Sequence, residues 1–592
     1  MDGSRLVSRL RATMLAWSVI ALSASSSFAT TPRIVYRSPV PGASLVRPET
    51  NLIWRFASPP DASVIGDIVV TGSASGLHAG RAVLAADGRT LLFQPATRFA
   101  WGETVDVRLG AEERFAFTIA RAPAGAAGAI GLDAEIEEVR AQDPGLTSVV
   151  QDDSAALPAI SSTIFRTPAK GRLFVSNFTL NGSATPFLMI LYDNGEPFFS
   201  RAMTATCDDW KEQPSGLLTY FDNSGDKFYG LDSAYAVVDS FAAGNGYRTD
   251  AHDMKLLPDG HALLMSYDPE IVDMSGLVAG GDTAAIVTGL ILQEIDEHKN
   301  VVFQWRSWDH FNILDATLVS FTATTIDCVH GNAIDLDFDG NLLLSSRHLD
   351  EITKIDRNNG DILWRFGGKN NQFTLQGDTV WFSHQHAIRW LGNGHYTLFD
   401  NGNGRTPPYS RACEYVLDQG NKTATLVWKY RNFPDSYGSA MGYVQRLDNG
   451  NTLICWGTGK PNLTEVTPEG EKVMELSLPP SQITYRGYRL PWKPDPETAA
   501  LGTGHLVSLS EAEPNPFRDT AEILATASAP TAISAQAFDV SGRELHGVVT
   551  LAPEGQNAYR IHVDLAGRAS GIYFCRVSGA EGSQVRRIVH LH

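Results

Sequence analysis

The sequence predicts an all-β protein in which a six-bladed β-propeller is flanked by two small β-sandwiches. Three observations lead to this fold class. The chain has 592 residues, too many for one hydrophobic core, so two to four domains are expected. Hairpin-like segments with Asp-Gly or Asn-Gly turns recur across 171–490. The segments on either side of this region also alternate apolar and polar residues at strand spacing.

The composition is that of a folded protein, because 43% of the residues are hydrophobic and only 19% are charged. The formal net charge is −18. Nucleic-acid binding depends on basic surfaces, so we expect no nucleic-acid partner.

The first residues have the pattern of an export signal. Arg5, Arg9 and Arg11 precede an apolar run at 14–24, which is too short to span a bilayer, and Ser27-Phe28-Ala29 ends in a small residue. The sequence therefore predicts a signal peptide at 1–29, periplasmic transit, and a secreted or cell-surface protein. No later run is long and apolar enough for a membrane span. The five cysteines are scattered and odd in number, so at least one is unpaired, and the sequence does not say which others pair.

Residues 30–121 are predicted to form the first sandwich. Leu52, Trp54 and Phe56 alternate with Ile53 and Arg55, and Asp87-Gly88 marks a turn. The stretches SPVPGASLVRPETNLIWRF and DGRTLLFQP resemble Ig-like domains of secreted bacterial proteins. The Ala/Gly-rich residues that follow, within 122–158, are expected to be a linker with a short helix.

The predicted propeller covers 159–497. Four hairpins align around their turns: 252–268, 330–347, 386–402 and 442–457. A second apolar pair follows several of them, as at 291–308, 354–368 and 464–478. Four strands per unit at a spacing of roughly 45–80 residues is typical of propeller blades. Two weaker units near 173–202 and 217–241 bring the expected number of blades to six.

The last part of the chain is predicted to be a separate small sandwich at 513–592, after a linker at 498–512. Its residues Asn515-Pro516, Asp539, Gly542-Arg543 and Gly571-Ile572-Tyr573 resemble the C-terminal sorting domains of type IX secretion. The resemblance implies that the secretion machinery is a partner of this domain. The alternative is an ordinary Ig-like module.

Three histidines share a position in the repeats. His252 and His386 each lie eight residues before the glycine of their turn, and His330 lies ten before its glycine. The innermost strands of a propeller surround a central channel, so we expect these three side chains to converge there. Arg347 follows the strand after His330 and should return to the same end. Arginine has forked donors that suit sulfate, phosphate or carboxylate, so the cluster predicts a pocket for a compact oxyanion.

These residues resemble the bacterial arylsulfotransferase (aryl-sulfate sulfotransferase) family over roughly 170–490. The resemblance rests on the HD-x-K-x-L segment at 252, H-x-N-x-I to SSR at 330–347, and Q-H to FDNG at 385–402. It implies an enzyme that moves a sulfuryl group from an aryl sulfate donor to a phenolic acceptor without a nucleotide donor or a cofactor. It also implies His386 as nucleophile, His330 and Arg347 as sulfate ligands, His252 as the third catalytic histidine, and Asn332 near the substrate.

Neutral imidazole is a good nucleophile near pH 7, and attack on sulfur would give a sulfo-histidine intermediate in a ping-pong reaction. His252 or His330 would then exchange the proton of the phenol. His384 shares a strand face with His386 but precedes the repeat, so it is not the expected nucleophile. His261, His348 and His395 follow turns or strands and are expected to be exposed.

Three other functions fit part of the pattern. The three histidines could hold zinc or copper in a metalloenzyme, although Arg347 places a cation beside the metal. A non-enzymatic propeller could bind glycans or partner proteins at the cell surface. A quinoprotein dehydrogenase would share GDILWRFGG, but the chain lacks an adjacent cysteine pair. A homodimer is compatible with the sequence.

Overall fold

The computed structural model describes residues 32–61, 64, 67–111, 113–122, 132–142, 157–180, 182, 184–492, 507–510, 512–527, 533–539, 544–555, 557–579 and 582–591. These residues form ten β-sheets with an 11-residue α-helix and short 3₁₀ turns, so the predicted all-β class is confirmed. The predicted signal peptide lies outside the described residues. Among the helices described, none has the length and apolar character that a membrane crossing requires.

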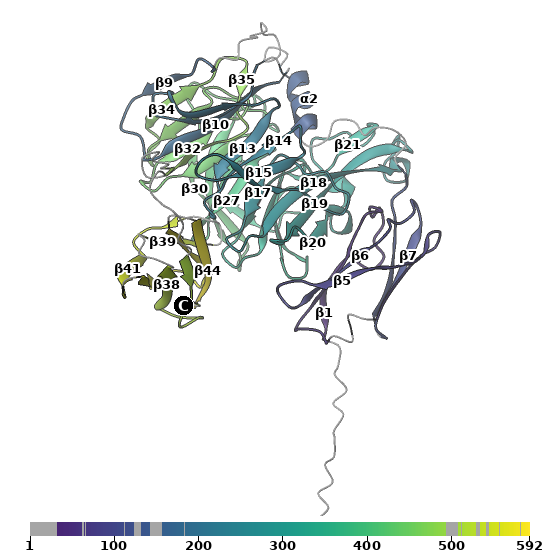
Figure 1. Cartoon of the computed structure of the whole chain (residues 1–592). Helices are drawn as coiled ribbons and strands as arrows, with labels where there is room; N and C mark the ends of the chain where they lie inside the picture. Colours follow the sequence, from purple (N-terminus) through teal and green to yellow (C-terminus); the bar gives the residue numbers. More distant parts are fainter. Residues whose placement is uncertain are drawn as a thin grey trace, which may run out of the picture.

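Two four-stranded sheets pack face to face in the N-terminal part of the chain, at the lower right of Figure 1. One has the order β1 (Ile34–Ser38), β2 (Leu52–Phe56), β6 (Thr90–Pro95) and β5 (Gly80–Leu84); the other has β4 (Gly76–His78), β3 (Ile68–Gly72), β7 (Thr104–Leu109) and β8 (Glu113–Thr118). Leu52, Trp54 and Phe56 are fully buried between them. Arg55 points the other way and donates to the carbonyl oxygen of Arg357 at 2.7 Å, which ties this part to the next.

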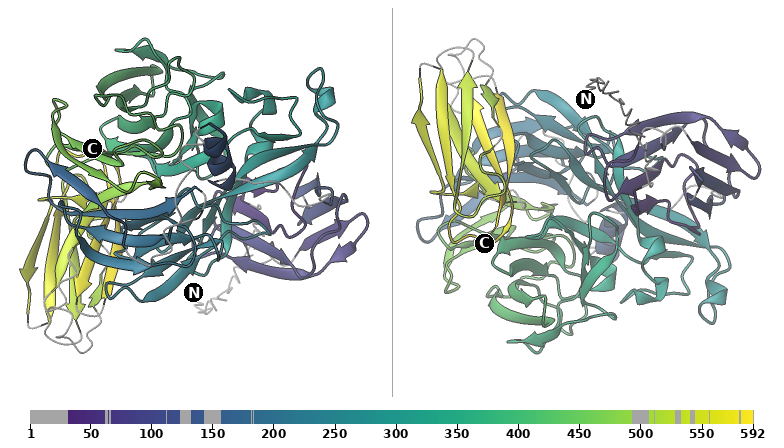
Figure 2. Two further views of the ribbon diagram at one scale, coloured as in Figure 1. Left: turned by 90° about the horizontal axis from the view of Figure 1, so that it is seen from above. Right: turned by 90° about the horizontal axis from the view of Figure 1, so that it is seen from below.

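Six sheets of four or five strands follow between residues 161 and 490 (Figures 1 and 2). The first contains β12 (Pro197–Ala202), β11 (Phe187–Leu191), β10 (Arg172–Thr179), β35 (Gln482–Ile483) and β36 (Gly487–Leu490). The second contains β13 (Cys207–Glu212), β14 (Leu218–Asp222), β15 (Lys227–Leu231) and β16 (Val237–Phe241). The third contains β17 (Met254–Leu256), β18 (Ala262–Val272), β19 (Ala285–Ile295), β20 (Val301–Arg306) and β21 (Thr325–Asp327).

The remaining three sheets contain the other aligned hairpins. The fourth has β22 (Gly331–Leu336), β23 (Leu342–Ser346), β24 (Glu351–Ile355) and β25 (Ile362–Gly367). The fifth has β26 (Thr374–Gln376), β30 (Thr423–Tyr430), β29 (Arg411–Asp418), β28 (His395–Asp400) and β27 (His386–Gly392). The sixth has β31 (Tyr443–Arg446), β32 (Thr452–Cys455), β33 (Leu463–Val466), β34 (Lys472–Ser477) and β9 (Ser161–Ile164).

The turn residues explain why these hairpins form where the sequence predicts them. Asn393 and Gly394 join β27 to β28 with φ of 50° and 75°, the left-handed values that a two-residue hairpin turn requires. The strands on either side are largely buried, and the six sheets pack against one another through three hydrophobic clusters.

The two ends of this region are paired with each other in two places. β36, near residue 490, pairs with β10, and β9, near residue 161, pairs with β34. The first and the last sheet therefore each contain a strand from the opposite end of the region.

The C-terminal part contains two further four-stranded sheets, yellow in Figures 1 and 2. Their orders are β37 (Val507–Leu509), β38 (Thr520–Ala527), β42 (Ala558–Asp564), β41 (Val549–Pro553), and β40 (Glu544–Leu545), β39 (Ser534–Asp539), β43 (Gly571–Gly579), β44 (Gly582–His590). They enclose their own core, which includes Ile561, Val563 and Cys575. All five cysteines of the chain are buried and unpaired.

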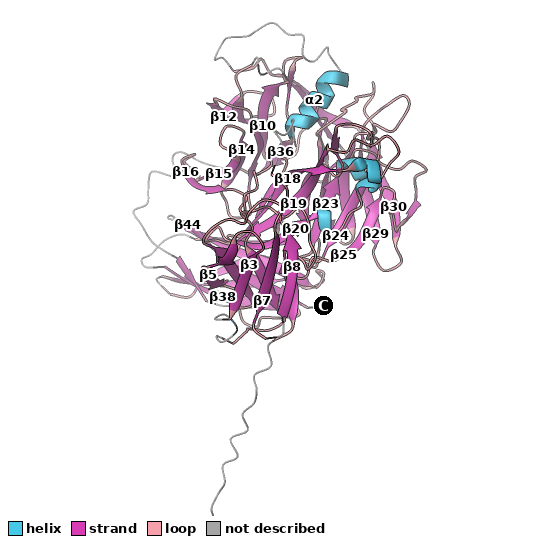
Figure 3. Cartoon of the chain, turned by 90° about the vertical axis from the view of Figure 1, so that its right-hand side faces the viewer, coloured by secondary structure: helices cyan, strands magenta, loops and turns pink. Residues whose placement is uncertain are grey.

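The helix α2 (Leu132–Gln142) lies in the predicted linker and docks on one end of the six sheets (Figures 1 and 3). Seen from above, it lies over the area where the sheets meet (Figure 2). The 3₁₀ turns are η2 (Met274–Gly276), η3 (Ser307–Asp309), η4 (Ile313–Asp315) and η5 (Arg347–Leu349).

Candidate active site

The three aligned histidines occupy equivalent places in three successive sheets. His252 lies two residues before β17, His330 lies directly before β22, and His386 is the first residue of β27. Each of these strands is the terminal strand of its sheet. The three side chains are fully buried, with exposed fractions of 0%, 1% and 0%.

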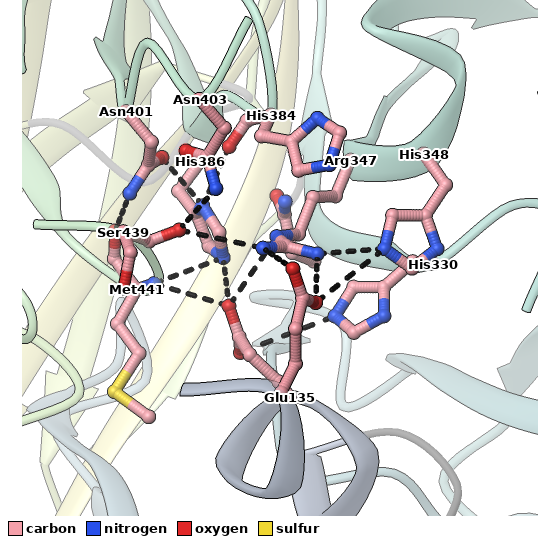
Figure 4. A network of polar contacts seen from close by, with 12 residues as sticks. Glu135, His330, Arg347, His348, His384, His386, Asn401, Asn403, Ser439 and Met441 are labelled. Atoms are coloured by element: carbon pink, nitrogen blue, oxygen red, sulfur yellow. Dashed lines mark hydrogen bonds and ion pairs between the residues drawn. The ribbon is translucent and has the colours of Figure 1, made fainter. Parts of the chain in front are cut away.

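All three imidazoles surround a single carboxylate, that of Glu135 on α2. Figure 4 labels two of them, His330 and His386. Its Oε1 lies 2.9 Å from His386 Nε2. Its Oε2 lies 3.3 Å from His252 Nε2 and 3.9 Å from His330 Nε2. Glu135 is itself fully buried, and its pKa is held well below 4.5 because the surrounding histidines outweigh the cost of burial.

Arg347 completes the ring around this carboxylate. Its side chain is fully buried, and its Nε lies 3.7 Å from Glu135 Oε1. The guanidinium also donates to both carboxylate oxygens of Glu138, at 2.7 and 3.1 Å, and to the carbonyl oxygen of Ser439 at 3.3 Å. His252, His330, His386 and Arg347, the four residues singled out in the sequence, therefore surround one carboxylate.

The tautomer of His386 follows from its neighbours (Figure 4). The amide nitrogen of Asn401 donates to the carbonyl oxygens of Gly438 and Met441, at 2.7 and 2.9 Å. Its Oδ1 must therefore accept from His386 Nδ1, 2.8 Å away. The backbone N–H of Met441 lies 3.1 Å from Glu135 Oε1 and 3.2 Å from His386 Nε2. An ionised carboxylate can only accept, so the 2.9 Å contact between Glu135 Oε1 and His386 Nε2 requires a proton on Nε2 while Glu135 is docked.

Burial lowers the pKa of His386, against the opposing effect of Glu135. When the Glu135 carboxylate is absent, burial favours the neutral ring, and Asn401 favours the tautomer with Nδ1 protonated and Nε2 available to attack an electrophile.

His252 is held in the opposite state. Its Nδ1 lies 2.7 Å from Asp250 Oδ1, so the ring lies between two carboxylates, those of Asp250 and Glu135. Burial lowers its pKa, but the two carboxylates outweigh burial and raise the pKa to about 10. His252 is therefore a cation at neutral pH and can give a proton from Nε2.

His330 is oriented in the same way, with Nδ1 at 2.7 Å from Asp327 Oδ2. Its Nε2 is buried and has no hydrogen-bond partner among the described residues; the same is true of Arg347 Nε. Two buried nitrogen atoms therefore face this pocket without a hydrogen-bond partner among the described residues.

Asn332 has a structural task beside His386. Its amide nitrogen donates to the carbonyl oxygen of Gln385 at 2.8 Å, and its Oδ1 accepts from the backbone N–H of Ala387 at 3.3 Å. Both contacts fix the backbone on either side of His386.

The expectation that His348 is exposed is wrong. The 3₁₀ turn η5 directs this side chain inward, where it is only 8% exposed. Its Nδ1 donates to the carbonyl oxygen of Asp327 at 2.7 Å, and its Nε2 lies 2.6 Å from Arg347 Nη1, so it fixes the guanidinium. His384 turns toward Asp350 instead, at 3.1 Å, and does not contact Glu135.

Sequence reasoning missed several members of this site. Asp250 and Asp327 precede their histidines by two and three residues, a local signal that could have found them. Asn401, within FDNG, was also readable as a polar residue after a buried strand. Nothing in the sequence pointed to Glu135, because it lies in the predicted linker, outside the repeated hairpins.

Two groups of side chains in the described part of the chain could hold a metal ion: Glu135, His252 and His330, and Asp327, His330 and His348. Both share His330. Arg347 contacts members of both groups, and a bound cation there would face the guanidinium charge. His386 belongs to neither group, so the predicted three-histidine metal site is not the arrangement found.

Comparison with known proteins identifies two parts of the chain. Residues 209–489 match the family model of arylsulfotransferase (ASST), and residues 513–590 match that of the secretion system C-terminal sorting domain. Both resemblances seen in the sequence are therefore confirmed, as are a sulfotransferase enzyme and export to the cell surface or the medium.

The other comparisons add little. No curated protein matches the chain significantly. Among solved structures, a streptogramin B lyase covers 70% of this chain and 99% of its own, at 10% identity and a TM-score of 0.28. A hydrazine synthase from Kuenenia stuttgartiensis covers 52% of this chain and 79% of its own, at 12% identity and a TM-score of 0.28. TM-scores this low carry no argument about fold or function.

Proposed function

Because residues 209–489 match the arylsulfotransferase model, we propose that this protein transfers a sulfuryl group from an aryl sulfate to a phenol through a sulfo-histidine at His386. The observation that carries the proposal is the convergence of His252, His330, His386 and Arg347 on one buried anion. Sulfate and carboxylate are both compact oxyanions, and these donors suit either.

In the first half-reaction, the Nε2 lone pair of His386 attacks sulfur. The N–S bond forms as the bond from sulfur to the aryl oxygen breaks, and that oxygen leaves with the electron pair. By analogy with phosphoryl transfer, charge spreads over the three equatorial oxygens. Arg347 and His330 lie where they would stabilise those oxygens.

We assign the proton transfers to His252. Asp250 raises the pKa of His252 and stays 2.7 Å from its Nδ1 when Glu135 is absent. The ring can therefore protonate the leaving phenolate and later accept the proton of the incoming phenol. In the second half-reaction the acceptor oxygen attacks sulfur, the N–S bond breaks, and its electron pair returns to His386. Asn332 has a positioning role here, in place of the substrate contact that the resemblance implies.

We further infer that the six sheets are the blades of a propeller at 159–497, with both of its ends closed by strand exchange. The N-terminal pair of sheets, at 30–121, would be an Ig-like domain, and 122–158 and 498–512 would be linkers. The part at 513–592 would be the sorting domain, and the signal peptide at 1–29 would be removed. A homodimer stays a prediction.

The test uses a chromogenic aryl sulfate with the purified protein. Incubation with donor alone should add one sulfuryl group to the protein, mapped to His386 by mass spectrometry, and an added phenol should discharge it. His386→Ala should abolish both. Phenol-dependent release at the full rate in His386→Ala would refute the proposal. Binding of sulfated glycans without any turnover would favour the non-enzymatic alternative.

A further inference from the structure

The Glu135 carboxylate occupies the position that the proposed reaction needs for its substrate. Its two oxygens lie within 2.9 to 3.9 Å of the reactive or anion-binding atoms of His252, His330, His386 and Arg347. Oxygen Oε1 lies 2.9 Å from His386 Nε2, on the side from which this nitrogen would have to attack sulfur. A sulfuryl group and this carboxylate cannot be present together.

The Glu135 carboxylate does not satisfy every polar atom of the pocket. His330 Nε2 and Arg347 Nε remain without a hydrogen-bond partner among the described residues, although both are buried. A sulfuryl group has three terminal oxygens where the carboxylate has two, so it offers a further acceptor within this pocket. The pocket therefore fits a larger oxyanion better than it fits Glu135.

The helix that carries Glu135 is suited to reversible docking. Glu135, Glu138 and Val139 lie at positions i, i+3 and i+4, so one face of α2 meets the site. Val139 is 1% exposed and Ile136 is partly buried against the core, so apolar packing contributes to the contact. Ion pairs add to it, because Glu135 contacts the histidines and Glu138 holds Arg347 with both oxygens, and an anion can compete for these partners.

A helix of 11 residues is also marginal by itself in water. Its order here depends on docking, and loss of the Glu135 contacts removes much of what holds it. An anion that takes over Arg347 and the histidines would displace the helix.

We propose that α2 is an intramolecular plug of the active site, in which Glu135 mimics the sulfuryl group and competes with the aryl sulfate donor. The proposal rests on the proposed function, because it identifies the carboxylate position with the sulfuryl position. The donor binds only the fraction of molecules whose site is open, so its apparent affinity is reduced by that fraction. Once the donor has displaced the helix, the chemical step is unaffected.

The experiment compares the full-length wild type with Glu135→Ala and Glu135→Gln. The glutamine variant keeps the size of the side chain and removes its charge. Glu137→Gln is the matched control, because Glu137 is on the same helix with an exposed side chain and makes the same change in net charge. Each protein is titrated calorimetrically with inorganic sulfate, and KM and kcat are measured with a chromogenic aryl sulfate and a phenol.

We expect both Glu135 variants to bind sulfate at least tenfold more tightly than the wild type and to lower the KM for donor by a similar factor. Their kcat should stay within about twofold of the wild type, and Glu137→Gln should match the wild type throughout. A fall in kcat without tighter sulfate binding would overturn the plug, since it would make Glu135 part of the catalytic machinery. Equal sulfate affinity in all four proteins would also overturn it.

The two proposals fail in different ways. If no protein transfers a sulfuryl group but the Glu135 variants bind sulfate more tightly, the proposed reaction is wrong and the plug of an anion site stands. If the wild type turns over and the variants change nothing, the reaction stands and the plug is wrong. Amide hydrogen exchange in the wild type gives a check without turnover: saturating sulfate should speed exchange in 136–142, and unchanged protection would contradict displacement of the helix.

Discussion

Asn401 offers a direct test of how His386, the proposed nucleophile, is prepared. The side chain is fully buried and makes three hydrogen bonds, one from His386 Nδ1 and two to the carbonyl oxygens of Gly438 and Met441. In Asn401→Ala, His386 Nδ1 keeps only the carbonyl oxygen of His384, at 3.2 Å. The ring can then also adopt the tautomer with the proton on Nε2, which cannot attack sulfur.

The size of the effect follows from these contacts. One buried hydrogen bond contributes about 0.5–1.5 kcal/mol, so losing the preference for one tautomer should reduce kcat/KM for the donor by roughly tenfold. The remaining bond to His384 is the reason why a larger loss is not expected. Two buried carbonyl oxygens lose their donors as well, and we expect the free energy of unfolding to fall by about 2–4 kcal/mol.

The assay is the rate at which donor alone sulfates His386, measured by quenched mass spectrometry, together with sulfate affinity. Asn401 does not contact the anion position, so sulfate affinity should change less than about twofold. Asn403→Ala is the control: its amide donates to Ser439 at 2.9 Å in the same loop but does not reach His386. Wild-type sulfation by a folded Asn401→Ala protein would refute the role of this hydrogen bond.

Two further changes test the charges around the pocket. Asp250→Asn removes a carboxylate that raises the pKa of His252, so the alkaline limb of the kcat/KM profile should move to lower pH. The raised pKa of His252 also stabilises the folded state; this contribution is complete below pH 6.5 and is lost as pH rises through about 10. The melting temperatures at pH 7 and pH 10 should therefore differ less in the variant than in the wild type. Arg347→Lys keeps the charge and loses the fork that holds Glu138, so kcat should fall on the order of 10²-fold or more while the protein stays folded. A kcat near that of the wild type would show that any cation suffices there.

The part of the site that follows the repeat pattern was predictable from the sequence. The turn glycines fixed the register of His252, His330 and His386, and register fixes which end of a strand a residue occupies. Arg347 followed because it ends the next strand of the same hairpin. The site therefore came from periodicity, although no short motif contains all four residues.

The remaining members depend on contacts that periodicity does not encode. Glu135 lies on α2, outside the repeats, and it contacts the three histidines only because this helix docks on the six sheets. His348 follows a strand, which suggested exposure, but the 3₁₀ turn η5 rotates it inward beside Arg347. The resemblance implies Asn332 near the substrate, which stays a prediction; its side chain also bonds to the backbone on either side of His386.

The exchange of strands between the first and last sheets has a consequence for how the chain matures. Strand β10 is synthesised early, yet its partner β36 ends at residue 490, so some 300 residues separate two neighbours in one sheet. Contacts this distant along the chain form late. Until then β10 presents an open edge that can pair with other chains. A truncated polypeptide that ends before residue 487 lacks β36 and should therefore aggregate, whereas one that reaches residue 490 can cover the edge of β10 with β36.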